Sequence, residues 1–257
     1  MSKKDFVMNE YVKEVLQDEL LRNDAFLTEE EIKTLLAEDE DKEYRTRETI
    51  IGYPIHPLYR ELGNMLTIWM QEKYCPALNL PKYDLLDEKT YAESRHCGLC
   101  GGGEEIKYRI REVLLLLGKR GILDLFGIRK TVGTKEIWPV SKEKLIKSFK
   151  EKHSPNSELW VGARALAKHF HRDNSNSWWG TSTGTEMDKN EHALKTLNKI
   201  MDNATWINIH WLPHDVIIVE MRQEEGYGAR WLADGSMFRG FLEPPDGGAG
   251  HDVGWRH

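Results

Sequence analysis

The clearest alternation of apolar and polar positions lies between Trp206 and Trp231. In residues 206–211, large apolar side chains alternate with Asn208 and His210, which is the period of a strand with one buried face. Three more short strands follow, separated by turn-forming residues, at 216–222, 227–232 and 236–242. Four consecutive strands joined by short loops predict an antiparallel meander.

Helical periodicity dominates the rest of the chain. Thr28 and Glu31 form a capping box at the start of a short helix. Apolar residues recur every three or four positions in residues 58–73 and 104–118, which predicts amphipathic helices. The first 150 residues therefore read as helical, with irregular and charged connections between the helices.

Two further helices are predicted directly before the strands. Ser157 would cap a helix over residues 158–171, and the signature from Thr185 to Asp188 opens a second helix over residues 186–202. Both helices have an apolar face that can cover a sheet. We therefore predict an α+β fold, in which a helical N-terminal half is followed by two helices packed on a four-stranded antiparallel meander.

Charge divides the chain into segments of opposite sign. Residues 1–50 carry 8 basic and 15 acidic side chains, residues 104–154 carry 13 and 7, and residues 155–257 carry 10 and 14. With the turn cluster near residue 153, this pattern predicts an acidic helical segment at 1–48, a basic helical region at 49–153 and an α+β domain at 154–257. The basic region is either the solvated face of lysine-rich helices or a patch for nucleic acid.

Composition indicates a protein of a reducing compartment. The three cysteines do not suggest a disulfide framework, and the first residues lack the apolar core of a secretory signal. No apolar run approaches the ~20 residues of a membrane span. We expect a cytoplasmic or nuclear protein without a membrane partner, and the sequence leaves its oligomeric state open.

A C-x-x-C pair, Cys97 and Cys100, could hold zinc or form a redox pair. A zinc ion would need two further ligands, and the sequence has no second C-x-x-C pair. The favoured interpretation is a glycine-rich turn with free thiols, so no cofactor is identified.

Two groups of residues could bind an anion. A loop rich in small hydroxylated residues runs into the helix at 186–202, and a helix N-terminus of this kind favours negative charge. Its candidate ligand-binding residues are Thr181, Ser182, Thr183 and Lys189. The polar side of the meander adds Arg222, Arg230 and Arg239.

The turn at Asp234 and Gly235 gives a geometric reason to expect a partner for these arginines. A two-residue turn there places Arg230 directly opposite Arg239, and like charges at that position repel. Glu220, Glu243 or a bound anion would relieve the repulsion.

Histidines and carboxylates in the same strands are candidates for catalysis. His210, His214, Asp215 and Glu220 include the residue types that general acid–base catalysis uses. Seven of the ten histidines lie after residue 168, so a metal site formed by some of them is also conceivable.

Three functions fit these patterns. The first is binding of a phosphate- or carboxylate-bearing ligand, including a nucleotide or nucleic acid, on the polar sheet face and the 180–189 loop. The second is a His/Asp-dependent hydrolase or phosphoesterase, with or without a metal. The third is a scaffolding protein without a small-molecule site, in which tryptophan and histidine only build the core.

Overall fold

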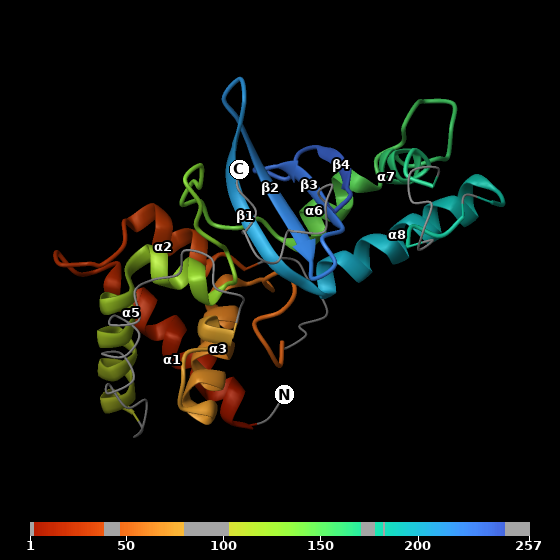
Figure 1. Cartoon of the computed structure of the whole chain (residues 1–257). Coiled ribbons are helices and arrows are strands. Elements are labelled where there is room, and N and C mark those ends of the chain that lie inside the picture. The colour runs from red at the N-terminus through yellow and green to blue at the C-terminus, as the bar shows by residue number, and fades with distance from the viewer. Residues whose placement is uncertain (1–2, 39–46, 80–102, 171–177, 182, 245–257) are drawn as a thin grey trace. The chain divides into compact units, whose positions relative to one another are not determined.

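A computed structural model describes residues 3–38, 47–79, 103–170, 178–181 and 183–244. It confirms the α+β fold, with a helical N-terminal half followed by helices and an antiparallel sheet. The chain forms two compact units (Figure 1), of which the first comprises residues 1–130 and 136–141 and the second residues 131–135 and 142–257. The units thus divide after Ser141, whereas the sequence favours a boundary after residue 153.

The first unit is helical. Its elements are α1 (Lys3–Glu19), α2 (Glu29–Leu36), α3 (Leu58–Glu72), the 3-10 helix η1 (Pro76–Asn79) and α5 (Glu104–Leu125). The predicted capping box of Thr28 and Glu31 is present at α2. The apolar stripe of α3, including Leu62 and Leu66, is fully buried between α1 and α5. Helix α5 extends past its predicted end to Leu125, with a kink at Gly118, whose φ of 58° is not helical.

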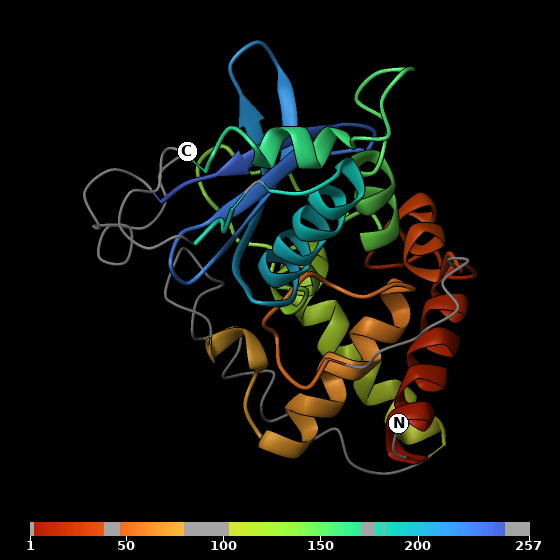
Figure 2. The ribbon, with the colours of Figure 1, turned by 90° about the vertical axis from the view of Figure 1, so that its right-hand side faces the viewer.

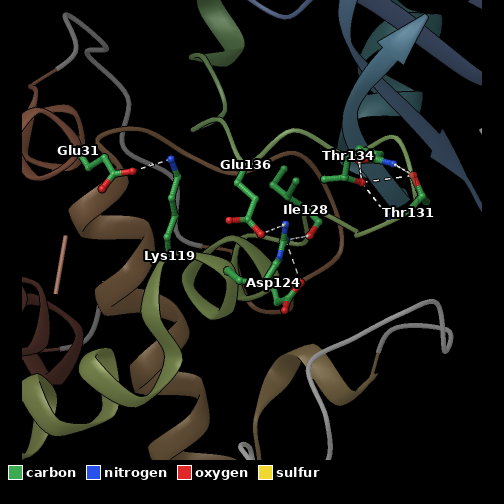
Figure 3. Close-up of polar contacts among 9 residues, drawn as sticks. Glu31, Lys119, Asp124, Ile128, Thr131, Thr134 and Glu136 are labelled. Carbon is green, nitrogen blue, oxygen red and sulfur yellow. Dashed lines mark hydrogen bonds and ion pairs between the residues drawn. The ribbon is translucent and has the colours of Figure 1, made fainter. Parts of the chain in front are cut away.

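Charged side chains inside the first unit are paired. Arg47 and Glu61 form a buried ion pair, and burial raises the pKa of the Glu61 carboxyl although Arg47 opposes the shift. Lys119 of α5 donates to Glu31 of α2 over 2.6 Å (Figure 3). Such pairing is expected because an unpartnered buried charge is strongly destabilising.

The second unit contains the sheet. Its elements are α6 (Lys142–Phe149), α7 (Val161–Leu166), α8 (Glu186–Asp202), β1 (Ala204–Leu212), β2 (Val216–Gln223), β3 (Gly228–Leu232) and β4 (Phe238–Leu242). The strand order is β1-β2-β3-β4 and each neighbouring pair is antiparallel, so the predicted meander is confirmed. The helix predicted at 186–202 is confirmed with its capping box of Thr185 and Asp188.

One face of the sheet is apolar and is covered by helices of this unit (Figure 2). Ile209, Met221 and Trp231 on this face are fully buried. The indole of Trp231 donates to the carbonyl of Leu145 in α6 over 3.0 Å. Phe149, also in α6, packs edge-on against β4. The opposite face must therefore carry the polar residues of the strands.

A short segment pairs with the outer edge of β1. We call residues 131–135 the edge segment; the chain belongs to the first unit on both sides of it. The Lys135 N–H donates to the Ile209 carbonyl over 2.7 Å, and the Trp211 N–H donates to the Gly133 carbonyl over 3.1 Å. These bonds satisfy backbone groups that an edge strand would otherwise leave open.

Two details differ from the sequence-based expectations. Helix α7 begins at Val161 rather than at residue 158, because the Ser157 hydroxyl bonds the Leu159 N–H and the Glu186 carboxylate instead of capping it. The β3–β4 connection is longer than a two-residue turn: the Leu232 N–H bonds the Met237 carbonyl.

None of the helices in the described ranges is long and apolar enough to cross a membrane.

Gly162 of α7 provides a test of this packing. A Cβ added there would lie 2.0 Å from the Phe149 ring, which itself is fully buried. We expect Gly162→Ala to lower the free energy of unfolding of the second unit by about 1–3 kcal/mol, the usual effect of overpacking. Chemical denaturation followed by tryptophan fluorescence measures the change. Lys168→Ala, an exposed change next to the same helix, should alter it by less than about 0.5 kcal/mol, and equal effects would contradict the packing.

Candidate functional site on the polar face of the sheet

A row of polar residues crosses the sheet on the face opposite the helices. The strand register places Asn208 of β1 beside Glu220 of β2, Glu220 beside Arg230 of β3, and Arg230 beside Gly240 of β4. His210 lies two residues from Asn208 on the same face, since side chains alternate along a strand. Arg222 stands in the same relation to Glu220. We call these five side chains (Asn208, His210, Glu220, Arg222 and Arg230) the polar face.

Glu220 is the centre of this group. Its carboxylate accepts a hydrogen bond from Nε of Arg222 over 2.7 Å, and its other oxygen lies 3.7 Å from Nε2 of His210. Arg222 also donates to the backbone carbonyls of Gly226 (2.8 Å) and Glu243 (3.0 Å). Because Glu220 is buried, these partners are what make a charged carboxylate tolerable there.

The geometry of His210 assigns different roles to its two ring nitrogens. Nδ1 lies 3.0 Å from the backbone carbonyl oxygen of Trp211, which can only accept, so Nδ1 carries a hydrogen. Nε2 is the ring nitrogen on the side of Glu220, 3.7 Å from its Oε2. An imidazole and a carboxylate held in this way can transfer protons.

Gly228 makes room for Arg222. It is the register partner of Arg222 in β3, and an added Cβ there would lie 2.8 Å from Cγ of Arg222 and 2.3 Å from the Met221 carbonyl oxygen. A side chain at this position would displace Arg222 from Glu220. The glycine is thus required by close approach rather than by a turn.

Arg230 is the part of the polar face that is open to a ligand. The residue is half-buried as a whole, while its Nε is enclosed and has no hydrogen-bond partner within the described ranges. A Cβ added at its neighbour Gly240 would meet no described atom within 4 Å. With two arginines against one glutamate, the polar face carries net positive charge, which suits an anionic ligand.

Asn208 connects the polar face to the edge segment. Thr134 donates from its hydroxyl to Oδ1 of Asn208 over 2.9 Å, and Nδ2 of Asn208 donates to the Thr131 hydroxyl over 2.9 Å (Figure 3). Neither threonine was among the residues predicted for the site. The pattern of β1 places Asn208 on the face of His210, but only the tertiary structure reveals its partners.

The predicted catalytic residues separate into two pairs. His210 and Glu220 come together on the polar face. His214 and Asp215 lie at the exposed tip of the β1–β2 hairpin, where both adopt positive φ angles of 69° and 59°. At about 3.3 Å per strand residue, the tip lies roughly 16 Å along β2 from Glu220, so the structure does not bring these two residues into the same cluster.

Arg239 lies apart from the other two arginines. The prediction that it faces Arg230 is wrong: Gly240 faces Arg230, and a bulge shifts the register before Trp231 pairs with Phe238. Asp234 accepts hydrogen bonds from the backbone and hydroxyl of Ser236, and the resulting longer loop changes the register. Arg239 is consequently exposed.

The loop before α8 already contains its own carboxylates. Asp188 bonds the Thr185 N–H, and Glu186 bonds the Ser157 hydroxyl and the Glu158 N–H. These hydrogen bonds lower the pKa of both acids. Thr181, Thr183 and Lys189 are exposed or half-buried in the structure, and Ser182 lies outside the described residues. The N-terminus of α8 is therefore occupied by the chain itself.

Other candidate sites contribute less. Cys97 and Cys100 lie outside the described residues, and Cys75 is buried. Among the described residues, no three His, Cys, Asp or Glu side chains are grouped to hold a metal ion. A second pair that the sequence did not reveal joins His169 to Glu243, with 2.7 Å between Nδ1 and Oε1.

Comparison with known families places the polar face within a matched region. Residues 149–243 match the family model described as the CdiA C-terminal tRNase toxin domain. The match includes all five residues of the polar face and excludes the edge segment. Curated proteins and solved structures give no match to this chain.

The carboxylates at the start of α8 predict acid sensitivity. Their pKa values are lowered in the folded protein, mainly by the hydroxyls of Ser157 and Thr185. Their contribution to stability is therefore present at neutral pH and is lost as the pH falls below about 4. We expect Asp188→Asn to reduce the fall in Tm between about pH 5 and pH 3. Glu191→Gln, in the same helix, should keep the wild-type pH dependence, and an unchanged slope in Asp188→Asn would contradict the cap.

Proposed function

We propose that the second unit is a ribonuclease that cleaves tRNA at the polar face. The observation that carries the proposal is the grouping of His210, Glu220, Arg222 and Arg230 on one face of the sheet, inside the region that matches a tRNase toxin domain. The family match supports the substrate class. The side chains supply the chemistry independently of the match.

RNA can be cleaved with its own 2′-hydroxyl as the nucleophile. The 2′ oxygen forms a bond to the adjacent phosphorus, and the bond from phosphorus to the 5′ oxygen breaks. A base must take the proton of the 2′-hydroxyl, and an acid must give a proton to the departing 5′ oxygen. The products are a 2′,3′-cyclic phosphate and a 5′-hydroxyl.

The polar face has one residue for each of these tasks. Glu220 is held as a hydrogen-bond acceptor by Arg222 and serves as the base. Nε2 of His210 donates the proton to the leaving oxygen, and the Trp211 carbonyl keeps the ring in the required orientation. Arg230, a half-buried arginine on the same face, binds the phosphate and stabilises the charge that develops on it.

This assignment combines the two leading functions expected from the sequence. The arginines provide the anion binding of the first, and His210 with Glu220 provide the acid–base chemistry of the second. The net positive charge of residues 104–154 would attract a polyanion at longer range. His214 and Asp215 have no part in the proposed reaction because they lie at the hairpin tip.

Removal of the proton-transferring groups tests the proposed mechanism. His210→Ala and Glu220→Gln should each lower the rate of tRNA cleavage by at least about 100-fold, the usual contribution of general acid–base catalysis. The rate is measured on purified tRNA by denaturing gel electrophoresis. His214→Ala is the matched control and should keep the wild-type rate, with circular dichroism to verify folding. Equal losses in His210→Ala and His214→Ala would contradict the assignment.

The two arginines of β3 and β4 form a second matched pair. In a His210→Ala background that does not cleave, Arg230→Ala should weaken tRNA binding roughly tenfold and reduce the salt dependence by about one phosphate contact. Arg239→Ala, which changes an exposed arginine one strand away, should change the affinity less than about twofold. Binding is measured by fluorescence anisotropy over a series of salt concentrations. Similar losses in both variants would indicate nonspecific attraction rather than a site at Arg230.

A further inference from the structure

The polar face is closed at one end and open at the other. Asn208 and His210, in β1, are 0% exposed, and Glu220 in β2 is 1% exposed. At the opposite end, Arg230 is half-buried and an added Cβ at Gly240 would have no described neighbour within 4 Å. A phosphate can therefore reach Arg230, whereas a group that must give a proton to RNA is enclosed.

The edge segment is bound at the closed end, beside His210 along the edge of β1. Its two backbone hydrogen bonds go to Ile209 and Trp211, the residues on either side of His210. Thr134 forms a bridge opposite His210 itself. The segment thus adds backbone to the sheet beside the proposed acid, along the edge of β1 that faces away from β2.

Two threonines fasten the edge segment to the polar face through Asn208. One hydroxyl donates to the Asn208 carbonyl oxygen and the other accepts from its amide nitrogen, each over 2.9 Å. The Thr131 N–H also donates to the Thr134 hydroxyl over 2.6 Å, which keeps the two side chains together. Both threonines of the edge segment are therefore hydrogen-bonded to the same buried side chain, the amide of Asn208.

The hold of this segment on the sheet relies on hydrogen bonds more than on apolar burial. Its apolar residue, Val132, is fully exposed, while Thr131 and Thr134 are half-buried. Hydrogen bonds contribute little net free energy when water can replace them, whereas buried apolar surface is costly to expose. A segment attached in this way can be released without unfolding the core.

We propose that the edge segment is an autoinhibitory strap that covers His210, and that its release opens the ribonuclease site to RNA. The inference that release of the strap increases cleavage rests on the proposed function. The inference that the strap covers His210 does not depend on that function. The strap lies outside the residues that match the toxin family. The strap precedes the matched region in the sequence. A segment outside the toxin-like region would therefore control access to the site within it.

The test compares variants that loosen the strap with the intact chain. Thr134→Val keeps the shape of the side chain and removes the hydroxyl that Asn208 and Thr131 share. Lys135→Pro removes the backbone donor to Ile209 and provides an independent way to loosen the strap. Thr196→Val is the matched control, because it removes a threonine hydroxyl bonded to a carbonyl within α8, away from the strap.

Two measurements are made on each full-length protein. Diethyl pyrocarbonate modifies accessible imidazoles, and tandem mass spectrometry separates His210 from the exposed His214, which serves as an internal reference. We expect the ratio of His210 to His214 labelling to rise roughly tenfold in both strap variants, the factor that corresponds to one lost net hydrogen bond. Cleavage of purified tRNA should rise by a similar factor, and the control should change neither quantity.

The outcomes separate the strap from the proposed function. Unchanged His210 labelling in both strap variants would overturn the covering. Increased labelling with decreased cleavage would overturn autoinhibition and show that the segment completes the active site. Increased labelling without tRNA cleavage by any form of the protein would support the covering and contradict the ribonuclease function.

Discussion

A carboxylate in the interior of a sheet needs partners, and the arrangement of the second unit follows from the way Glu220 obtains them. Arg222 reaches it from two residues along the same strand, and His210 approaches it from β1. Arg222 is in turn fixed by the carbonyls of Gly226, just before β3, and Glu243, just after β4. The close approach of β3 to Arg222 also requires the glycine at position 228. Removal of the carboxylate would leave a buried guanidinium, which is far more costly than the loss of a surface ion pair.

This arrangement separates the faces of the sheet by function. The apolar face packs on α6, α7 and α8 and supplies stability through tryptophan and phenylalanine side chains. The polar face holds charged groups in fixed positions. Fixed groups of this kind are suited to a reaction in which charge develops at a known place.

Local patterns predicted much of this structure. The alternation in residues 206–211 and the capping box of Thr185 and Asp188 each depend on a few adjacent residues, and both are present. His210 and Glu220 were selected by residue type, together with His214 and Asp215, and it is the register of β1 with β2 that places His210 and Glu220 on one face. The same reasoning failed where side chains change the backbone path, as at Asp234, whose bonds to Ser236 lengthen the turn and move Arg239 away from Arg230.

Long-range contacts could not be predicted in this way. Thr134 and Asn208 are 74 positions apart, and nothing in the pattern of residues 131–135 indicates that they pair with β1. The sequence also predicted an anion site at the N-terminus of α8. It could not show that the Glu186 carboxylate accepts a hydrogen bond from the Ser157 hydroxyl, 29 positions earlier in the chain. These contacts depend on how distant elements pack against each other. Among them, the pairing of the edge segment with β1 matters most for the proposed function, because it lies beside His210.

The most direct measurement for the central claim is the chemical identity of the ends left on tRNA after incubation with the full chain. Nucleophilic attack by the 2′-hydroxyl, with Glu220 as base and His210 as acid, predicts a 2′,3′-cyclic phosphate on one fragment and a 5′-hydroxyl on the other. Ligation-based mapping and phosphatase treatment distinguish these ends from a 3′-hydroxyl and a 5′-phosphate. Fragments with 5′-phosphate ends, or tRNA that stays intact even with the strap variants, would contradict the assignment of the polar face as a ribonuclease site.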